Sequence, residues 1–465
     1  MDIRIGEERV KAENRFGVID PCTGEIFADA PETSETQLDA VVEAAALAQV
    51  KWATDEAARR AALHECAATL RVQAEPLAAV LCAEQGKPFA KAHREVMGAA
   101  RWFEYTADLP LETRILMDTP DMRVELHRRP LGVVGAITPW NYPVMSAVWK
   151  IAPALLAGNS VILKPSPFTP LSALKLADML ENVLPAGVLH VVAGGGALGA
   201  ALSAHPGVQK VSFTGSTATG KKVYAAGAAD MKRLTLELGG NDAAIVLDDV
   251  DPEKVAEKIF WGAFENSGQV CVTIKRLYVH ERIADALVKA LVKRAEVAKL
   301  GAPMEEGVEL GPVNNAPQFA RVQELVEDAR KVGGRIETGG ARRGDKGYFW
   351  APTIVTGLGD EARLVREEQF GPALPVLTFK DADEAITRAN ASAFGLAGSI
   401  WSADPARAAA LSSHMQCGTV WINQHLTIMP IAPINGWKQS GLGVENGVEG
   451  LAAFSQFQTV EIALT

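Results

Sequence analysis

The chain has 465 residues, of which 48% are hydrophobic and 22% charged, and its formal net charge is −10. This length exceeds one ordinary hydrophobic core and predicts two or more domains, and the composition is typical of a soluble globular protein rather than a disordered or fibrous one. The acidic balance argues against nucleic acid and anionic membrane surfaces as partners.

The N-terminal segment, residues 1–14, is charged and lacks the apolar core of a secretory signal. No stretch approaches the roughly 20 consecutive apolar residues that a membrane-spanning helix needs. The five cysteines form no CxxC pair, and the eight histidines include no HExxH motif. We therefore expect no disulfide framework, no metal site and a cytoplasmic location.

Helical patterns dominate the first 110 residues. Ser34 and Gln37 have the spacing of a capping box, and the apolar residues that follow them recur at helical spacing. A second helix is predicted around Cys66, and a third ends near the stop signal at residues 86–88.

From residue 131 onward, short apolar runs alternate with helices. The predicted strands are residues 133–138, 161–163, 188–192 and 208–214. Gly158 predicts the end of one intervening helix, and residues 169–170 (Thr-Pro) predict the cap and start of the next. Apolar strands separated by helices are typical of an α/β fold whose parallel sheet binds ligands at the carboxyl ends of its strands.

A second α/β alternation begins after Gly240. It includes a predicted strand at residues 243–247, a helix that starts at Pro252 and a strand near residues 420–423. A segment rich in Pro and Gly then precedes residues 457–464, which alternate like a strand and suit an edge strand used for assembly.

Three predicted strand ends carry residues that could bind a ligand. Asn141 offers an amide donor for a developing oxyanion, although Asn is also common in turns. Lys164 faces the expected ligand crevice and could bind a nucleotide; the alternative is a solvated lysine. The glycines of residues 213–220 could let a pyrophosphate approach a helix N-terminus, or form a plain turn.

Two further residues could act on a substrate. Glu237 lies between two leucines, which predicts partial burial and a raised pKa suited to a general base; a surface glutamate at a domain junction is the alternative. Cys271 follows polar residues 266–269, which predict an exposed loop, and cysteine is the side chain closest to being a nucleophile at neutral pH. Cys66 and Cys82 lie on helical faces and suit a packing role.

In order along nearly the whole chain, these segments resemble the motifs of the NAD(P)-dependent aldehyde dehydrogenase superfamily. The most specific matches are PWN (139–141) with KP (164–165), FTGS (213–216), LELGG (236–240), FxNxGQxC (264–271) and EExFGP (367–372). The spacings from Asn141 to Lys164 and from Glu237 to Cys271 also agree with the family.

The resemblance implies an aldehyde-dehydrogenase-like α/β fold. Residues 1–110 and 131–239 would form a Rossmann-type, parallel-sheet cofactor domain, and residues 240–435 an α/β catalytic domain. Residues 111–130 and 452–465 would form a small β oligomerisation element, through which family members join as homodimers or homotetramers.

The resemblance also implies a mechanism. The Cys271 thiolate would attack the aldehyde, while the Asn141 side chain and the Cys271 backbone N–H stabilise the oxyanion. Hydride would pass to the nicotinamide, which leaves a thioester, and Glu237 would activate the water that releases the acid. Glu445 matches an acidic residue thought to assist proton relay.

The implied cofactor is NAD or NADP, with NAD slightly favoured. Lys164 and Glu368 match the residues that hold the two riboses. The other matches at the cofactor site are Trp140, Gly215, Ser216, Leu238 and Phe370. Pro167 is a departure, because many NAD-preferring relatives have an acidic residue there that binds the adenosine ribose, and this leaves the preference between NAD and NADP open.

The expected substrate is a small-molecule aldehyde. The matched tunnel residues, nearly all apolar and none of them Arg or Lys, are Tyr142, Trp149, Val270, Val272, Ile428 and Ile434. An aromatic or medium-chain aliphatic aldehyde fits them best, since each buried CH2 contributes about 0.8 kcal/mol. The nearby His425 could hydrogen-bond a substrate hydroxyl, or have no ligand role.

Other activities are the alternatives. They are a semialdehyde or betaine-type dehydrogenase and a CoA-acylating relative; the latter generally lacks the base that Glu237 matches. A chain retained only as a binding or structural protein would show an eroded site, and no erosion is visible in these motifs.

Overall fold

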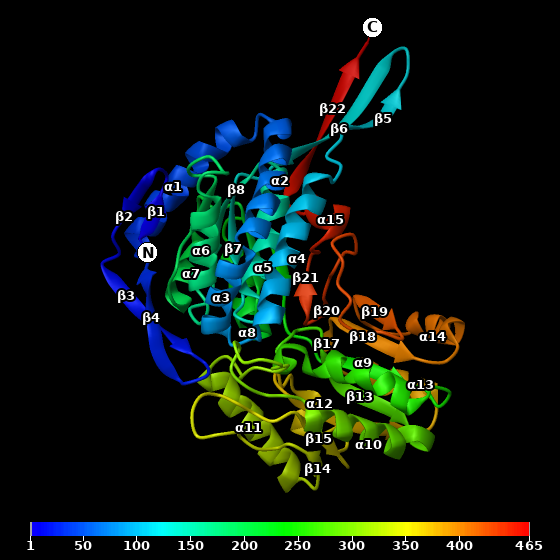
Figure 1. Cartoon of the computed structure of the whole chain (residues 1–465). Coiled ribbons are helices and arrows are strands. Elements are labelled where there is room, and N and C mark those ends of the chain that lie inside the picture. Colours follow the sequence, from blue (N-terminus) through cyan, green and yellow to red (C-terminus); the bar gives the residue numbers. More distant parts are fainter. Residues whose placement is uncertain (1, 465) are drawn as a thin grey trace.

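The apolar runs of the first alternation become neighbouring strands of one sheet in the computed structural model, which describes residues 2–464 (Figure 1). The sheet has the order β21-β11-β10-β7-β8-β9, and only the pairing of β21 with β11 is antiparallel. Its strands are β7 (Val133–Ile137), β8 (Ser160–Lys164), β9 (Leu189–Val191), β10 (Lys210–Thr214), β11 (Arg233–Glu237) and β21 (Gly441–Leu442). The predicted parallel sheet is confirmed.

Alternate side chains of these strands enter two different cores, because successive residues of a strand point to opposite faces. Val133 and Ile137 pack with α1, α7 and α8, whereas Val134 and Ala136 pack with α2 to α6. These helices are α1 (Glu35–Trp52), α2 (Glu56–Val72), α3 (Ala74–Gln85), α4 (Phe89–Ala107), α5 (Pro143–Leu156), α6 (Leu171–Leu180), α7 (Gly196–Ala204) and α8 (Thr217–Gly227). Helices on both faces of a parallel sheet form the Rossmann-type arrangement.

The start of α6 differs from the sequence expectation of a local cap at residues 169–170. The helix begins at Leu171 without a local side-chain cap. Instead, the buried Glu84 carboxylate of α3 accepts from the backbone N–H groups of Leu171 and Ser172 at 2.7 and 2.9 Å. The first turn of α6 is thus satisfied by a tertiary contact, which local sequence does not indicate.

The second alternation forms a seven-stranded sheet of order β14-β15-β16-β13-β12-β18-β19, parallel except for β14. The strands are β12 (Asp242–Val246), β13 (Ile274–His280), β14 (Arg335–Thr338), β15 (Thr353–Thr356), β16 (Ala373–Phe379), β18 (Ala397–Trp401) and β19 (Thr419–Ile422). Helices α9 and α10 pack on one face, and α13 and α14 on the other. The helices of this part are α9 (Pro252–Phe264), η1 (Glu265–Gly268), α10 (Glu281–Val297), α11 (Ala316–Lys331), α12 (Arg363–Arg366), α13 (Ala382–Asn390) and α14 (Pro405–Ser412).

Short strands and hairpins complete the chain. Before α1 lie β1 (Ile3–Ile5), β2 (Glu8–Val10), β3 (Asn14–Asp20) and β4 (Glu25–Glu32), and toward the end lie β17 (Phe394–Gly395), β20 (Trp437–Lys438) and α15 (Gly447–Ala452). The predicted capping box at the start of α1 is present: Ser34 Oγ accepts from Gln37 N–H at 3.2 Å, and Gln37 Oε1 from Ser34 N–H at 3.0 Å.

A three-stranded arm projects from the body of the molecule (Figure 1). Its strands, in the order β22-β6-β5, are β5 (Arg114–Asp118), β6 (Met122–Pro130) and β22 (Ser455–Ala463). The C-terminal segment predicted to alternate like a strand is therefore an edge strand of this arm. The arm exposes apolar side chains, which are Ile115, Leu116, Met117, Met122, Phe457, Ile462 and Leu464.

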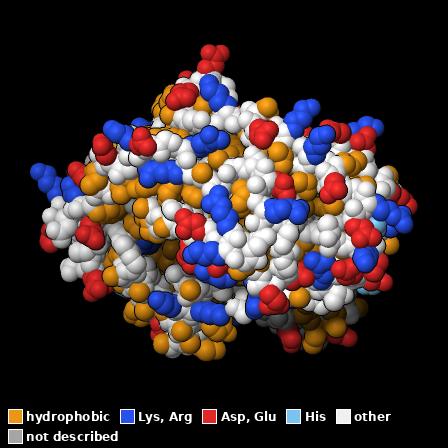
Figure 2. All heavy atoms as spheres, turned by 90° about the horizontal axis from the view of Figure 1, so that it is seen from below, with side chains coloured by type: hydrophobic (Ala, Val, Ile, Leu, Met, Phe, Trp, Pro, Cys, Tyr) orange, Lys and Arg blue, Asp and Glu red, His pale blue; other side chains and the backbone are white. Residues whose placement is uncertain are grey.

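Charged side chains of both signs are interspersed over the face of the molecule seen from below (Figure 2). Within residues 2–464, no single helix is long and apolar enough to cross a membrane, and α2 and α3 pass that test only together, as a pair bent by 71°.

Candidate active site

The ends of the first sheet's strands face the second sheet across a cavity of about 960 Å³. Every site residue predicted from the sequence lines this cavity, with the exception of Lys164. The lining comes from the loop after β7, the ends of β10 and β11, the turn before β13, the segment after α12 and the C-terminal loops. Residues far apart in the chain thus converge because carboxyl ends of parallel strands share one edge of a sheet.

The turn that presents Cys271 is buried, and the prediction of an exposed loop at residues 266–269 is wrong. Asn266 and Ser267 adopt left-handed backbone angles, with φ of 50° and 56°. Their polar groups bind backbone rather than water: Ser267 Oγ donates to Gly311 O at 2.7 Å, and Gln269 Nε2 to Asn266 O at 2.8 Å. These polar residues hold a strained turn in place, and Cys271 itself is half-buried at its end.

Asn141, in the loop between β7 and α5, is oriented by its neighbours. Its Nδ2 donates one hydrogen to Gln269 O at 2.8 Å, which leaves the second amide hydrogen available to a ligand. Its backbone carbonyl accepts from Lys87 Nζ at 2.9 Å and from Asn266 Nδ2 at 3.1 Å. The side chain is therefore tied to the Cys271 turn through Gln269.

Glu237, the last residue of β11, is buried, and its Oε1 has no hydrogen-bond partner among residues 2–464. Burial, with the nearby Glu445, raises its pKa well above the usual value, and Lys150 counteracts this. Lys150 Nζ is paired with Glu445 and donates to Thr214 Oγ1 at 2.7 Å, while Ser212 Oγ donates to Glu445 Oε1 at 3.1 Å. The predicted burial of Glu237 is confirmed, and so is the predicted direction of its pKa shift.

The polar end of the cavity suits a dinucleotide. Lys164 at the end of β8 is buried, donates to Pro165 O at 3.1 Å, and has a pKa lowered to about 8 by that burial. Gly195 and Gly196 leave open space where a Cβ would stand, so the backbone at the start of α7 can approach a bulky group. Ser216 is the N-cap residue of α8, a helix terminus that favours anions.

The opposite wall of this end carries Glu368 and Phe370. Glu368 Oε1 accepts from Gly240 N–H at 3.0 Å. The rings of Phe370 and Trp140 meet edge to face with centroids 5.3 Å apart. A bound NAD(P) would be held here by Lys164, Glu368 and the N-terminus of α8, and would supply a hydride acceptor.

The other end of the cavity is largely apolar and contains the six predicted substrate residues. Sequence reasoning missed Trp102 and Met145, and also Arg94 and Arg101 on α4. The six predicted residues include no Arg or Lys, but the cavity as a whole does contain arginines. Helical spacing was the available signal, because residues 94, 98, 101 and 102 share one face of α4.

His425 lines the cavity, but both its ring nitrogens are already engaged. Nδ1 lies 2.9 Å from Ser399 Oγ and Nε2 lies 2.8 Å from Val272 O. Burial lowers its pKa to about 3, so the ring is neutral. Its role is to hold the strand that follows Cys271, and the interpretation of His425 as a residue without a ligand role agrees with these contacts.

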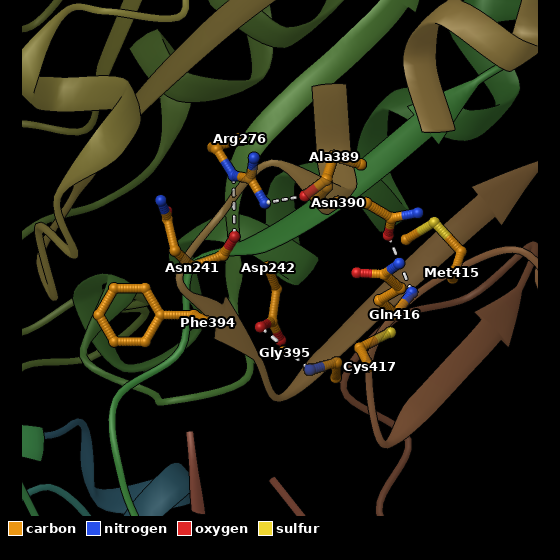
Figure 3. A pocket seen from close by; sticks show the side chains of 12 residues that line it. Asn241, Asp242, Arg276, Ala389, Asn390, Phe394, Gly395, Met415, Gln416 and Cys417 are labelled. Carbon is orange, nitrogen blue, oxygen red and sulfur yellow. Dashed lines mark hydrogen bonds between the residues drawn. The ribbon is translucent and has the colours of Figure 1, made fainter. Parts of the chain in front are cut away.

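Behind the cavity, Asn241, Asp242 and Arg276 line a second, narrow pocket (Figure 3). Arg276 Nε donates to Asn241 O at 2.8 Å, and Asp242 Oδ1 accepts from Ala397 N–H at 3.1 Å. These bonds tie β12 and β13 to β18 and to α13, and they support the floor of the cavity.

A Rossmann-type sheet that faces a half-buried thiol across one cavity defines an oxidoreductase dependent on a dinucleotide. The model of the aldehyde dehydrogenase family matches residues 9–460. The chain belongs to this family and is an NAD(P)-dependent aldehyde dehydrogenase.

Individual relatives agree with this membership over almost their full lengths. Aldehyde dehydrogenase LUC3 of Fusarium sp is 41% identical over 98% of this chain and 97% of its own length. Aldehyde dehydrogenase, cytosolic 1, of Rattus norvegicus is 39% identical over 97% of this chain and 92% of its own. The NAD+ complex of aldehyde dehydrogenase from Bacillus cereus superposes with a TM-score of 0.98 at 35% identity, over 100% of this chain and 97% of that one.

Proposed function

We propose that this enzyme oxidises an apolar aldehyde to the carboxylic acid through a thioester on Cys271. The observation that carries the proposal is that Cys271, Asn141 and Glu237 line one cavity with an apolar end and a dinucleotide-like end. Attack of the Cys271 sulfur on the carbonyl carbon forms a C–S bond and an oxyanion, which Asn141 Nδ2 and the Cys271 backbone N–H stabilise.

NAD(P), which Lys164, Glu368 and the N-terminus of α8 would hold, would accept the hydride that this carbon loses, and the carbonyl would then re-form as the thioester on Cys271. Glu237 then takes a proton from the water that attacks the thioester, and the C–S bond breaks to release the acid. Glu445 and Lys150 act on Glu237 electrostatically: Glu445 raises its pKa and Lys150 lowers it. The intact carboxyl at Glu237 favours hydrolysis over transfer of the acyl group to CoA, so added CoA should not change the product.

The substrate proposal rests on the apolar end. A medium-chain or aromatic aldehyde would bury its body against Tyr142, Trp149 and Trp102. The Trp149 indole N–H is buried without a partner among residues 2–464, so it can donate to an oxygen on the substrate. The test is kcat/KM for hexanal and benzaldehyde against betaine aldehyde and succinic semialdehyde, followed by the absorbance of reduced nicotinamide.

Arg94 and Arg101 favour a second candidate, an aldehyde with a distant carboxylate. Both line the cavity, both are exposed, and guanidinium groups bind carboxylates in a bidentate manner. If succinic semialdehyde were the best of the four substrates, the apolar proposal would be wrong. The double variant Arg94→Met/Arg101→Met should then lose that substrate selectively and keep hexanal.

For the cofactor, we propose use of NAD with appreciable use of NADP. Pro167 provides no carboxylate to repel a 2′-phosphate, and the Lys164 ammonium can attract one. The test is kcat/KM with each cofactor. A preference for NAD beyond about a thousandfold, or roughly 4 kcal/mol, would show that another residue excludes NADP.

We also propose that the projecting arm joins two or more copies of this chain in the cytosol. Exposed apolar side chains on β5 and β22 would be covered by the arm or body of a second copy. The cytosolic location is supported by the name of the rat relative, a cytosolic aldehyde dehydrogenase, and by the five unpaired cysteines.

A further inference from the structure

Lys275 is a buried lysine of β13 that lies four residues after Cys271 and outside the motifs that predict the site. Its side chain is 1% exposed. Its Nζ donates to Val270 O at 2.8 Å and to Cys271 O at 2.7 Å, and lies 3.6 Å from Glu368 Oε1. Two backbone carbonyls therefore accept from the ammonium group, and the Glu368 carboxylate forms an ion pair with it.

Strand alternation explains why this lysine faces the reacting cysteine. Lys275 and Arg276 are successive residues of β13 and point to opposite faces. Arg276 enters the narrow pocket behind the cavity, where its guanidinium binds Asn241 O and Ala389 O (Figure 3). Lys275 is thereby left on the side of Cys271 and Glu368.

We propose that Lys275 is a positioning residue that fixes the Cys271 turn against Glu368 and places a positive charge beside the thiolate. Its two bonds to carbonyls orient the peptide units on either side of the Cys271 Cα. The first of these units contains the Cys271 N–H, which donates to the oxyanion in the function proposed above, and the inference rests on that function. Through Glu368 the same ammonium also joins the nucleophile to the cofactor end of the cavity.

The charges around the thiol make this contribution measurable. Burial, together with the nearby Asp242, Glu237 and Glu368, raises the pKa of Cys271 to about 12, whereas Lys275 acts to lower it. The other ionisable groups that face the thiol or the ammonium are Tyr142 and His425. Loss of the ammonium should therefore reduce the thiolate fraction at every pH below the pKa.

Lys232 offers a matched control on the first sheet. It is equally buried, donates to His205 O and Val208 O at 2.7 Å each, and lies 3.2 Å from Asp230. Lys232→Met thus removes an ammonium with the same kinds of partners, without a nucleophile beside it.

The experiment measures the rate at which iodoacetamide alkylates Cys271 between about pH 6 and about pH 10. It uses the full-length protein without cofactor, and mass spectrometry quantifies the modified peptide. In Lys275→Met, alkylation near neutral pH should slow at least about tenfold, as expected for loss of an opposite charge a few ångströms away. Lys275→Arg should restore most of the rate, and Lys232→Met should leave it unchanged. Lys275→Gln keeps N–H donors for the two carbonyls but carries no charge, and its Cys271 should also be alkylated slowly. This variant replaces Lys275→Met in the experiment if Lys275→Met does not fold.

An unchanged alkylation rate in both Lys275→Met and Lys275→Gln would overturn the inference. So would an equal loss of rate in Lys232→Met, or alkylation of Lys275→Arg as slow as that of Lys275→Met. Steady-state assays in parallel should show a raised KM for NAD in Lys275→Met because Glu368 loses its partner. If the wild-type protein oxidised no aldehyde, the proposed function would fail, while the alkylation rates would still decide the role of Lys275.

Discussion

At the residue scale, Cys271, the proposed nucleophile, is distinguished from the other cysteines by its surroundings. Cys66 and Cys82 are fully packed in the core of α2 to α6, whereas Cys271 is half-buried on the cavity. Cys271→Ala should lower kcat/KM more than about a thousandfold because no other thiol can form the C–S bond. Cys66→Ala should retain activity in the same assay, and full turnover by Cys271→Ala would rule out the thioester.

Glu237 can be tested by separating hydride transfer from hydrolysis. Glu237→Gln keeps the shape of the side chain but cannot take a proton from water, so one equivalent of reduced cofactor should form rapidly. Steady-state turnover should then fall about a hundredfold or more. Stopped-flow absorbance distinguishes the two phases, and an unchanged steady-state rate would exclude Glu237 as the base.

The pH dependence of kcat follows from the charges at this carboxyl. A base must be ionised, so kcat should fall as pH decreases through the raised pKa of Glu237. Lys150 lowers that pKa, and Lys150→Met should consequently move the acid limb of the profile to higher pH. Lys232→Met is the control. If the acid limbs of the kcat profiles of Lys150→Met and Lys232→Met coincided, the coupling between Lys150 and Glu237 would be contradicted.

At the element scale, one buried ion pair holds the loop that carries Asn141. Lys87 Nζ lies 2.5 Å from Glu95 Oε2 and 3.8 Å from the centre of the Tyr142 ring, and it also binds Asn141 O. Glu95 Oε1 accepts from the N–H groups of residues 144 and 145 at the start of α5. The N-terminus of α5, the Asn141 backbone and the Tyr142 ring therefore all contact this pair.

Removal of one partner should be costly because the other is left charged in the core. Lys87→Met should lower the free energy of unfolding by about 3–5 kcal/mol, measured by denaturant titration of tryptophan fluorescence. Lys91→Met is the matched control, since its pair with Glu265 is 13% and 24% exposed and should contribute less than about 1 kcal/mol. If both variants lost the same free energy of unfolding, the burial of the ion pair would not determine how much stability its removal costs.

Local patterns predicted the elements well, and distant partners account for what they missed. Apolar runs and breakers located β7 to β10 of the first sheet and β12 and β19 of the second, because burial on two faces leaves a direct trace in the sequence, whereas β13 to β16 and β18 were not predicted. The Glu84 cap of α6, the buried turn at residues 266–269 and the role of Lys275 depend on contacts between segments far apart in the chain. Motif resemblance gathered the predicted site residues, yet Arg94 and Arg101 belong to no motif.

At the scale of the whole molecule, the projecting arm predicts the assembly state. A charge at Leu116 or Phe457, which are 51% and 62% exposed, would have to be buried against a second copy. The double variant Leu116→Asp/Phe457→Asp should therefore weaken self-association at least tenfold, or by about 1.4 kcal/mol, in sedimentation velocity. Val72→Asp alters an apolar residue on the body that is even more exposed, at 79%, and should leave association intact.

The antiparallel edge strand β21 affects how the enzyme is made. Gly441 pairs with Glu237 on β11, Leu238 N–H donates to Ser440 O at 2.8 Å, and Glu445 completes the buried cluster around Lys150. The other strands of both sheets are therefore synthesised before β21, the strand that completes the edge of the first sheet. Until then a nascent chain presents β11 as an open edge, available to chaperones or to misassembly, and the site is complete only after residues 441–445 have been synthesised.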